Sequence, residues 1–185
     1  MSAAEIAQKV TRYRTYFGKE GGVTVSGGEP LLQANFVREL FSLCRAEGIN
    51  TCLDTSGSLM NDEIGALLSV TDRVLLDIKY PTDEQYRRFV GCGIDGPLAF
   101  LSYLNEKKIP TTLRQVVIPT LNDTPESVAF LNALRGQFLC VDGVELLPFK
   151  KICQMKYDQM GLEFPFACYD TPTKADMARL QAFLK

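Results

Sequence analysis

The chain has 185 residues, of which 46% are hydrophobic and 23% are charged, and these proportions are typical of an ordinary globular domain and exclude a disordered or low-complexity chain. Its formal net charge of −2 argues against a nucleic acid or an anionic membrane as a partner recognised by bulk charge. Histidine is absent, which excludes Ser-His-Asp and Cys-His catalysis and every histidine-ligated zinc or haem site.

Short β-rich runs alternate with amphipathic helical windows along the chain. Ser2 and Glu5 form an S-x-x-E capping box, which predicts a first helix that continues to Phe17. The predicted strands are residues 22–26, 50–54, 73–79, 111–119 and 141–149. The later predicted helices are residues 36–47, 61–70, a short one from Thr82 with a second capping box at Gln85, one begun by Pro97, one capped by Thr124, and 173–184.

The spacing of these elements predicts the fold class. Each strand with its following helix is roughly the length of a right-handed βαβ crossover. The chain is therefore expected to form one α/β domain over residues 1–185 with a parallel sheet, either doubly wound or a partial barrel.

The chain shows neither a transmembrane run nor the layout of a signal peptide, so we expect a cytoplasmic protein. Six cysteines are spread along the sequence without a C-x2-C or C-x3-C pair. In a reducing compartment such cysteines are expected to be free thiols, several of them packed as small apolar side chains.

Ligands of parallel sheets bind at the carboxyl ends of the strands, and polar residues gather at those positions here. Asp77 and Lys79 should point to the same side of their strand, either as a structural ion pair or as part of a site. Arg114 within an apolar strand has the same two interpretations. Asp54 and Thr55 belong to an Asp-Thr-Ser-Gly segment that fits an ordinary turn better than a cation site.

Gly27 and Gly28 follow the first strand directly. They would let a ligand approach the main chain, although most double glycines merely turn a corner. The segment is neither G-x-G-x-x-G nor a P-loop, so it gives only weak support for phosphate binding.

Five segments taken together strongly resemble the pyruvate formate-lyase activating enzymes, which are radical S-adenosylmethionine proteins that install a glycyl radical. The resemblance runs from Ala3 to Lys185, in order and with matching spacing. The segments are GVTVSGGEPLLQ (22–33), TCLDTSG (51–57), LLDIK (75–79), LRQVVIP (113–119) and VELLPF (144–149).

This resemblance implies a partial (β/α)6 barrel, here with about five strands and without the first. It assigns Ser26, Gly27, Gly28 and Glu29 to the element that receives the methionine amino group, and Lys79 to the methionine carboxylate. Asp54, Thr55 and Asp77 would form a monovalent-cation site, with Asp77 also beside the cofactor. Arg114 would be an active-site arginine, and Lys150 stands where relatives carry a histidine near the ribose.

The resemblance also implies a 4Fe-4S cluster held by C-x3-C-x2-C, a motif that this sequence does not contain. In the family the motif precedes the segment that corresponds to the first helix, so we expect an N-terminally truncated chain. An engineered truncation, a shortened natural gene product and a complete protein that works without a cluster are the three explanations, and the retained Asp54, Asp77 and Lys79 favour truncation. The chain as given is expected to be inactive.

The expected function is therefore that of a fragment of a glycyl-radical-enzyme activating protein of anaerobic metabolism. Its cofactor would be S-adenosylmethionine, cleaved to a 5′-deoxyadenosyl radical that takes hydrogen from a glycine of pyruvate formate-lyase or a relative. Flavodoxin or ferredoxin would supply the electron to the intact protein. The alternatives are a cluster-free module that binds a partner or an adenosyl ligand, and an unrelated (β/α) enzyme with its own acid-base pair.

Overall fold

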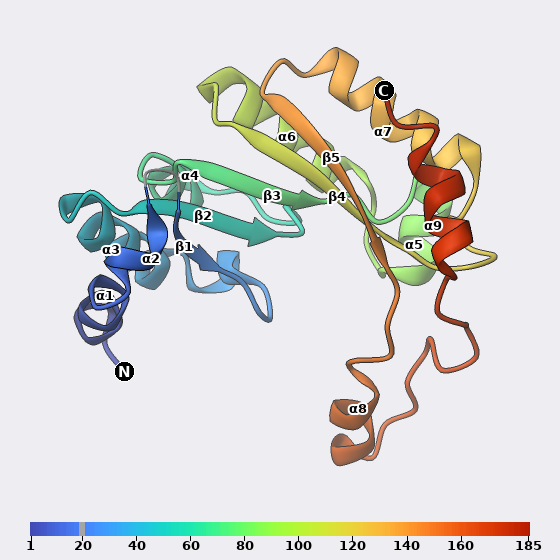
Figure 1. Ribbon diagram of the computed structural model, residues 1–185, viewed down its shortest axis with the longest axis horizontal. Helices are drawn as coiled ribbons and strands as arrows, with labels where there is room; N and C mark the ends of the chain where they lie inside the picture. The colour runs from blue at the N-terminus through green and yellow to red at the C-terminus, as the bar shows by residue number, and fades with distance from the viewer. Residues whose placement is uncertain (19–20) are drawn as a thin grey trace.

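The computed structural model describes residues 1–18 and 21–185, and its centre is a five-stranded sheet (Figure 1). The strands are β1 (Gly22–Val25), β2 (Asn50–Thr55), β3 (Arg73–Asp77), β4 (Thr111–Val117) and β5 (Val141–Pro148). They lie side by side in chain order, and every neighbouring pair is parallel. Within the described residues the sheet is open, with β1 and β5 at its edges. The predicted partial barrel is confirmed, because a doubly wound sheet would reverse its strand order.

The two faces of the sheet differ in chemistry because side chains alternate along each strand. The outer face is apolar, and Leu53, Leu76 and Leu113 on it are fully buried. On the inner face, Asp54 and Arg114 occupy the positions that follow two of these leucines and are only half-buried. The hydrophobic core therefore fills the space behind the sheet and leaves polar groups on the opposite face.

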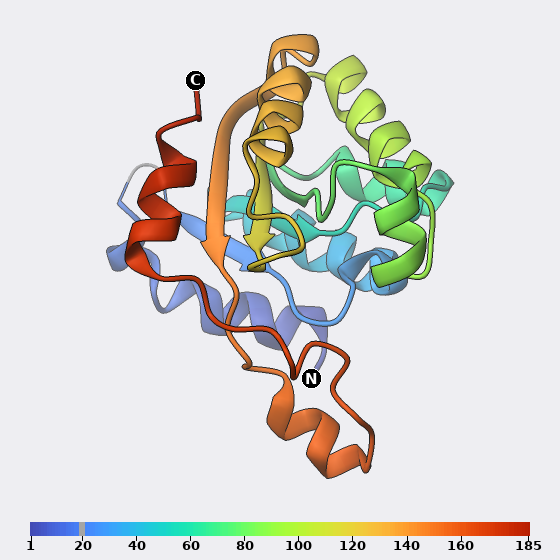
Figure 2. The same ribbon diagram turned by 90° about the vertical axis from the view of Figure 1, so that its right-hand side faces the viewer.

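Helices cover the outer face of the sheet (Figure 1). After the 3-10 turn η1 (Pro30–Gln33), they are α3 (Ala34–Ala46), α4 (Asp62–Leu68), α6 (Asp95–Lys107) and α7 (Pro125–Gln137). Helix α5 (Asp83–Phe89) packs in a separate apolar cluster with Tyr80 and Ile94. The terminal helix α9 (Lys174–Gln181) lies along β5 (Figure 2). No helix in the described part of the chain is both long and apolar enough to cross a bilayer.

The first helix is shorter than predicted. It divides into α1 (Ala3–Thr11), which packs on α3, and the single turn α2 (Arg14–Phe17). The predicted capping box is present, because Ser2 and Glu5 bond each other's backbone amides. The helix ends where the amides of Arg12 and Tyr13 donate to carbonyls only three residues earlier in the chain, which is 3-10 geometry. The spacing of apolar residues does not predict this change.

Two further helix predictions need correction. The backbone amide of Gln85 bonds the Thr82 hydroxyl as predicted, but the Gln85 side chain donates to the carbonyl of Leu121 and does not close the second capping box. Helix α6 begins at Asp95, two residues before the proline that was expected to start it, because proline is tolerated throughout the first turn.

Residues 149–171 form an arm that extends away from the carboxyl end of β5 (Figure 2). It carries α8 (Gln154–Met160), a helix that the sequence analysis did not predict. The arm is held by aromatic packing: the Phe149 and Phe164 rings stack with centroids 6.5 Å apart, and Tyr157 of α8 lies 5.1 Å from Phe164. None of the buried residues of the chain lies on α8 itself, so the helix lacks the apolar stripe from which it could have been predicted.

Candidate functional site

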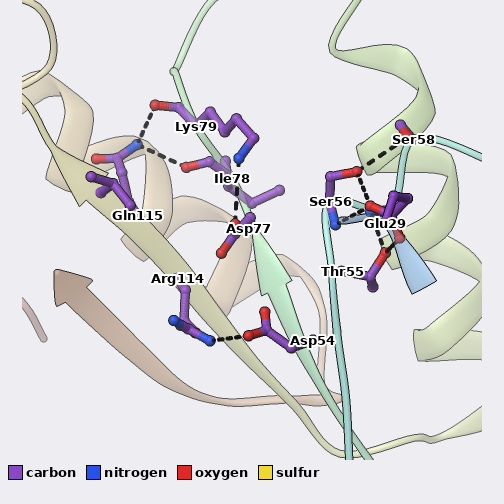
Figure 3. Close-up of polar contacts among 12 residues, drawn as sticks. Glu29, Asp54, Thr55, Ser56, Ser58, Asp77, Ile78, Lys79, Arg114 and Gln115 are labelled. Carbon is purple, nitrogen blue, oxygen red and sulfur yellow. Dashed lines mark hydrogen bonds and ion pairs between the residues drawn. The ribbon is translucent and has the colours of Figure 1, made fainter. Parts of the chain in front are cut away.

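Four charged side chains from neighbouring strands meet on the inner face, near the carboxyl ends of the strands (Figure 3). They are Asp54 of β2, Asp77 and the adjoining Lys79 of β3, and Arg114 of β4. The strand register produces this arrangement, because Arg114 lies directly opposite Asp77 on one side and Glu145 of β5 on the other. The structure thus brings together the acidic and basic residues that the sequence placed at strand ends.

Arg114 forms the central ion pair of this group. Its Nη1 lies 2.9 Å from Asp54 Oδ2, and its Nε lies 3.9 Å from Glu145 Oε2. The Nε atom is buried and has no hydrogen-bond partner within the described residues. A buried donor left unsatisfied costs about 1–3 kcal/mol, so this N–H is a strong candidate to donate to a bound ligand.

Asp77 and Lys79 form the second pair, with Nζ 3.4 Å from Oδ2. Burial raises the pKa of Asp77; the charges of Lys79 and Arg114 oppose the rise, and the neighbouring carboxylate of Asp54 adds to it. Two neighbouring acid-base pairs can hold a ligand that carries both a carboxylate and an ammonium group. The site is therefore suited to the amino-acid end of a ligand.

The loop after β1 lies beside this group and contains the double glycine. Gly27 and Gly28 have φ angles of 87° and 54°, a left-handed conformation that glycine adopts without strain. A Cβ at either position would meet no atom within 4 Å, so the main chain here is open to an approaching ligand. Ser26 is exposed at the start of the loop.

Glu29 fastens this loop to the end of β2 (Figure 3). One carboxylate oxygen accepts from the Thr55 hydroxyl at 2.6 Å and from the Leu31 amide at 3.1 Å. The other accepts from the Ser56 amide at 3.0 Å and from its hydroxyl at 2.5 Å. Burial by itself would raise the pKa of Glu29, but these hydrogen bonds from Ser56, Thr55 and Leu31 together hold it below its ordinary value. The Glu29 side chain thus connects two loops of the site. Ser56 takes part in this connection through its amide and its hydroxyl, a role that the sequence analysis missed.

The three residues assigned to a cation site separate onto two faces. Asp54 and Asp77 share the inner face, but the Thr55 hydroxyl is buried on the outer side, where it donates to Glu29 and accepts from the Gly57 amide. Among the described residues, no cluster of three acidic, cysteine or histidine side chains could hold a metal ion.

Among the described residues, the Lys150 ammonium forms no ion pair with the four charged side chains. It is exposed just after β5, and its carbonyl accepts from the amide of Ile152 at the start of the arm. A hollow of about 670 Å³ lies at the opposite, amino-terminal end of the strands, lined by residues such as Gly22, Cys52 and Arg73, and contains none of the predicted site residues.

The cysteines do not fit an iron-sulfur cluster, which needs several thiolates on one side of the metal group. Cys44 and Cys140 are buried in separate parts of the core, where burial raises the pKa of each thiol. The remaining cysteines are half-buried or exposed, at positions 52, 92, 153 and 168. No three of the cysteines whose placement is described come together.

Comparison with known proteins identifies the class. Residues 1–131 match the family described as the Radical SAM superfamily, so the chain belongs to that superfamily. The pyruvate formate-lyase 1-activating enzyme of Escherichia coli K12 is 36% identical over 188 aligned positions, which cover all of this chain and 76% of that protein. The pyruvate formate-lyase-activating enzyme of Clostridium pasteurianum is 35% identical and is covered to 78%. The chain is thus a member of the pyruvate formate-lyase activating enzymes, which confirms the resemblance.

Solved structures agree with the fold. A domain of the pyruvate-formate lyase-activating enzyme from Bacteroides vulgatus superposes with a TM-score of 0.71 at 19% identity, covering 88% of this chain and 92% of that one. SuiB of Streptococcus suis, bound to its precursor peptide SuiA, gives a TM-score of 0.74 at 16% identity over 99% of this chain and 38% of that one. At these identities the likeness concerns the barrel alone.

Proposed function

We propose that this chain provides the S-adenosylmethionine-binding wall of a pyruvate formate-lyase activating enzyme. The observation that carries the proposal is the convergence of Asp54, Asp77, Lys79 and Arg114 from three neighbouring strands in a chain of this family. The protein substrate would be pyruvate formate-lyase or a related glycyl radical enzyme. The reaction would take place in the cytoplasm, with flavodoxin or ferredoxin as electron donor.

Each site residue binds a different part of the ligand in this proposal. The Lys79 ammonium binds the methionine carboxylate, and the open main chain of Gly27 and Gly28 receives the amino group. The free Nε–H of Arg114 donates to an acceptor of the ligand or substrate. Lys150 serves as a donor near the ribose, and Asp54, Thr55 and Asp77 hold a monovalent cation, with Thr55 contributing through its main chain. S-Adenosylmethionine supplies the 5′-deoxyadenosyl radical of this family when it is reduced.

The four residues Ser26, Gly27, Gly28 and Glu29 act as one loop in this proposal. Glu29 contributes through its main chain, because both oxygens of its carboxylate already accept from Thr55, Ser56 and Leu31. The Glu29 side chain holds the loop against β2, so that the glycine main chain faces the ligand.

Calorimetric titration with S-adenosylmethionine tests this proposal. Replacing Lys79 by alanine should weaken binding roughly tenfold or more, since hydrogen bonds to charged groups are worth about 1.5–3 kcal/mol. Lys107→Ala, at the far end of α6 where the lysine pairs with Glu106, is the matched control and should bind as the unaltered protein does. Equal affinities of all three proteins would overturn the assignment.

A cluster-free binding module remains a second candidate, because the six cysteines do not converge. Such a module would hold an adenosyl ligand or a partner without turnover. The genomic sequence directly upstream of Met1 separates the two. An in-frame C-x3-C-x2-C there supports the activating enzyme, whereas an independent translation start supports the module.

A further inference from the structure

The main chain of Lys79 lies just beyond the sheet. Strand β3 ends at Asp77, and the amide of Ile78 still donates to the carbonyl of Arg114 on β4 at 2.8 Å. Buried main-chain groups need partners, and beyond this point Lys79 obtains them from side chains. The backbone of this site lysine is therefore held by specific residues outside the strand ladder.

Three side chains, which we call the backbone clamp, make these contacts: Tyr86, Gln115 and Asn122. The Lys79 amide donates to the Tyr86 hydroxyl at 3.0 Å. The Lys79 carbonyl accepts from Asn122 Nδ2 at 3.0 Å and from Gln115 Nε2 at 3.4 Å. Gln115 also donates to the carbonyl of Ile78 at 3.1 Å (Figure 3).

The clamp residues are themselves fixed in place. Tyr86 is 1% exposed, and Gln115 and Asn122 are each 2% exposed. The Gln115 Oε1 atom accepts from the Ser127 hydroxyl at 2.8 Å, and the Asn122 Oδ1 atom accepts from the Ile118 amide at 2.7 Å. Burial raises the pKa of Tyr86 to about 12, so its phenol stays neutral while its oxygen accepts the hydrogen bond from the Lys79 amide. A satisfied buried network of this kind holds one geometry.

The three side chains come from separate elements. Tyr86 is on α5, Gln115 is on β4, and Asn122 is in the loop before α7. All three bond the main chain of Lys79. The ammonium of the same residue pairs with Asp77. Apolar residues could fill the same buried space, whereas only polar side chains can fix the direction of a main-chain amide and carbonyl.

We propose that Tyr86, Gln115 and Asn122 are positioning residues that fix the main chain of Lys79, so that its ammonium is held where it meets a carboxylate ligand beside Asp77. This inference rests on the proposed function. The clamp touches no ligand and acts only through Lys79.

Tyr86→Phe tests the clamp because it removes a single oxygen atom and keeps the ring. The matched control is Tyr80→Phe: Tyr80 is 3% exposed and packs edge-on against Tyr86, and the described part of the chain gives its hydroxyl no hydrogen bond. Titration with S-adenosylmethionine should show binding about fivefold weaker in Tyr86→Phe, the loss expected for one hydrogen bond, and unchanged in Tyr80→Phe. In a Lys79→Ala background, Tyr86→Phe should cause no further loss.

A ligand-free measurement keeps the test independent of binding. Amide hydrogen exchange of Lys79, followed by NMR, should become about tenfold faster in Tyr86→Phe and should not change in Tyr80→Phe. Gln115→Met, of similar length, provides a second variant that should weaken binding in the same way.

The outcomes separate the two proposals. If Lys79→Ala weakens binding while Tyr86→Phe and Gln115→Met bind normally, the clamp is overturned and the proposed function stands. If Lys79→Ala has no effect on binding, the proposed function fails. Unchanged Lys79 exchange in Tyr86→Phe overturns the clamp in either case.

Discussion

Glu29 illustrates how one carboxylate can organise two loops. It accepts hydrogen bonds from Leu31 on its own loop and from Thr55 and Ser56 at the end of β2. These four bonds stabilise the ionised form and keep its pKa below the ordinary 4.5 despite the burial that opposes this. The stability of the site should therefore depend on pH.

Glu29→Gln should lower the free energy of unfolding by about 2 kcal/mol at pH 7, since a neutral amide replaces charge-assisted acceptors. Because the folded pKa of Glu29 is depressed, its contribution is fully present above its ordinary pKa of 4.5 and is lost as the pH falls through the folded value. Urea denaturation at neutral and acid pH measures the difference. The exposed Glu39→Gln is the control, and a difference that does not shrink in acid would contradict the prediction.

Asp77→Asn should have the opposite effect on stability. The folded pKa of Asp77 is raised, chiefly by burial, so the folded state binds more protons than the unfolded state above the ordinary 3.8. Stability then falls as the pH rises through this range, and removing the charge should raise the melting temperature at pH 7. The gain should vanish below both pKa values, and a lower melting temperature at pH 7 would contradict it.

At the scale of the elements, the turn after β2 depends on Gly57. Its φ angle is +63°, and a Cβ there would lie 2.7 Å from Leu76 Cδ1 and 3.1 Å from Phe100 Cδ1. Gly57→Ala should lower the free energy of unfolding by about 2–4 kcal/mol, because a left-handed backbone and an overpacked core both oppose it. Chemical denaturation measures this loss.

Gly136 on α7 offers the contrasting substitution. It is exposed, and a Cβ there would meet nothing within 4 Å. Gly136→Ala should raise the free energy of unfolding by about 0.5 kcal/mol, since alanine has less freedom to lose on folding. Equal effects of the two substitutions would show that backbone conformation and crowding at position 57 do not matter.

Some elements could be predicted from the sequence because their signals are local. The apolar run around Leu76 and the alternation through Asp77 identify β3 and its polar face. The break between α1 and α2, and helix α8, depend on hydrogen bonds and aromatic contacts that no periodic pattern contains.

The site shows the same limit. Residue types at strand ends indicated Asp54, Asp77, Lys79 and Arg114, because parallel strands bring their carboxyl ends together. The pairing of Arg114 with Asp54 across an intervening strand depends on side-chain reach, which the sequence spacing does not contain. The position of Thr55 on the opposite face follows from strand alternation, but its bond with Glu29 joins residues 26 positions apart and could not be predicted from neighbouring residues.

At the scale of the whole molecule, the positions of the cysteines determine whether the chain can bind an iron-sulfur cluster. Anaerobic reconstitution with iron and sulfide should leave far less than one cluster per chain, because no three described cysteines meet. Iron analysis and the visible absorption spectrum measure this, with a full-length activating enzyme treated in parallel. A complete cluster on the six cysteines would contradict the prediction.

A ligand bound to the inner face of the sheet would affect how long the protein survives. A molecule bound there would touch β2, β3 and β4 at once through Asp54, Asp77 and Arg114, and so would add contacts between strands that backbone hydrogen bonds already join. A ligand present at a hundred times its dissociation constant adds about 2.7 kcal/mol to the unfolding free energy. If S-adenosylmethionine is that ligand, as proposed, a cell that ran short of it would lose molecules of this protein to proteolysis.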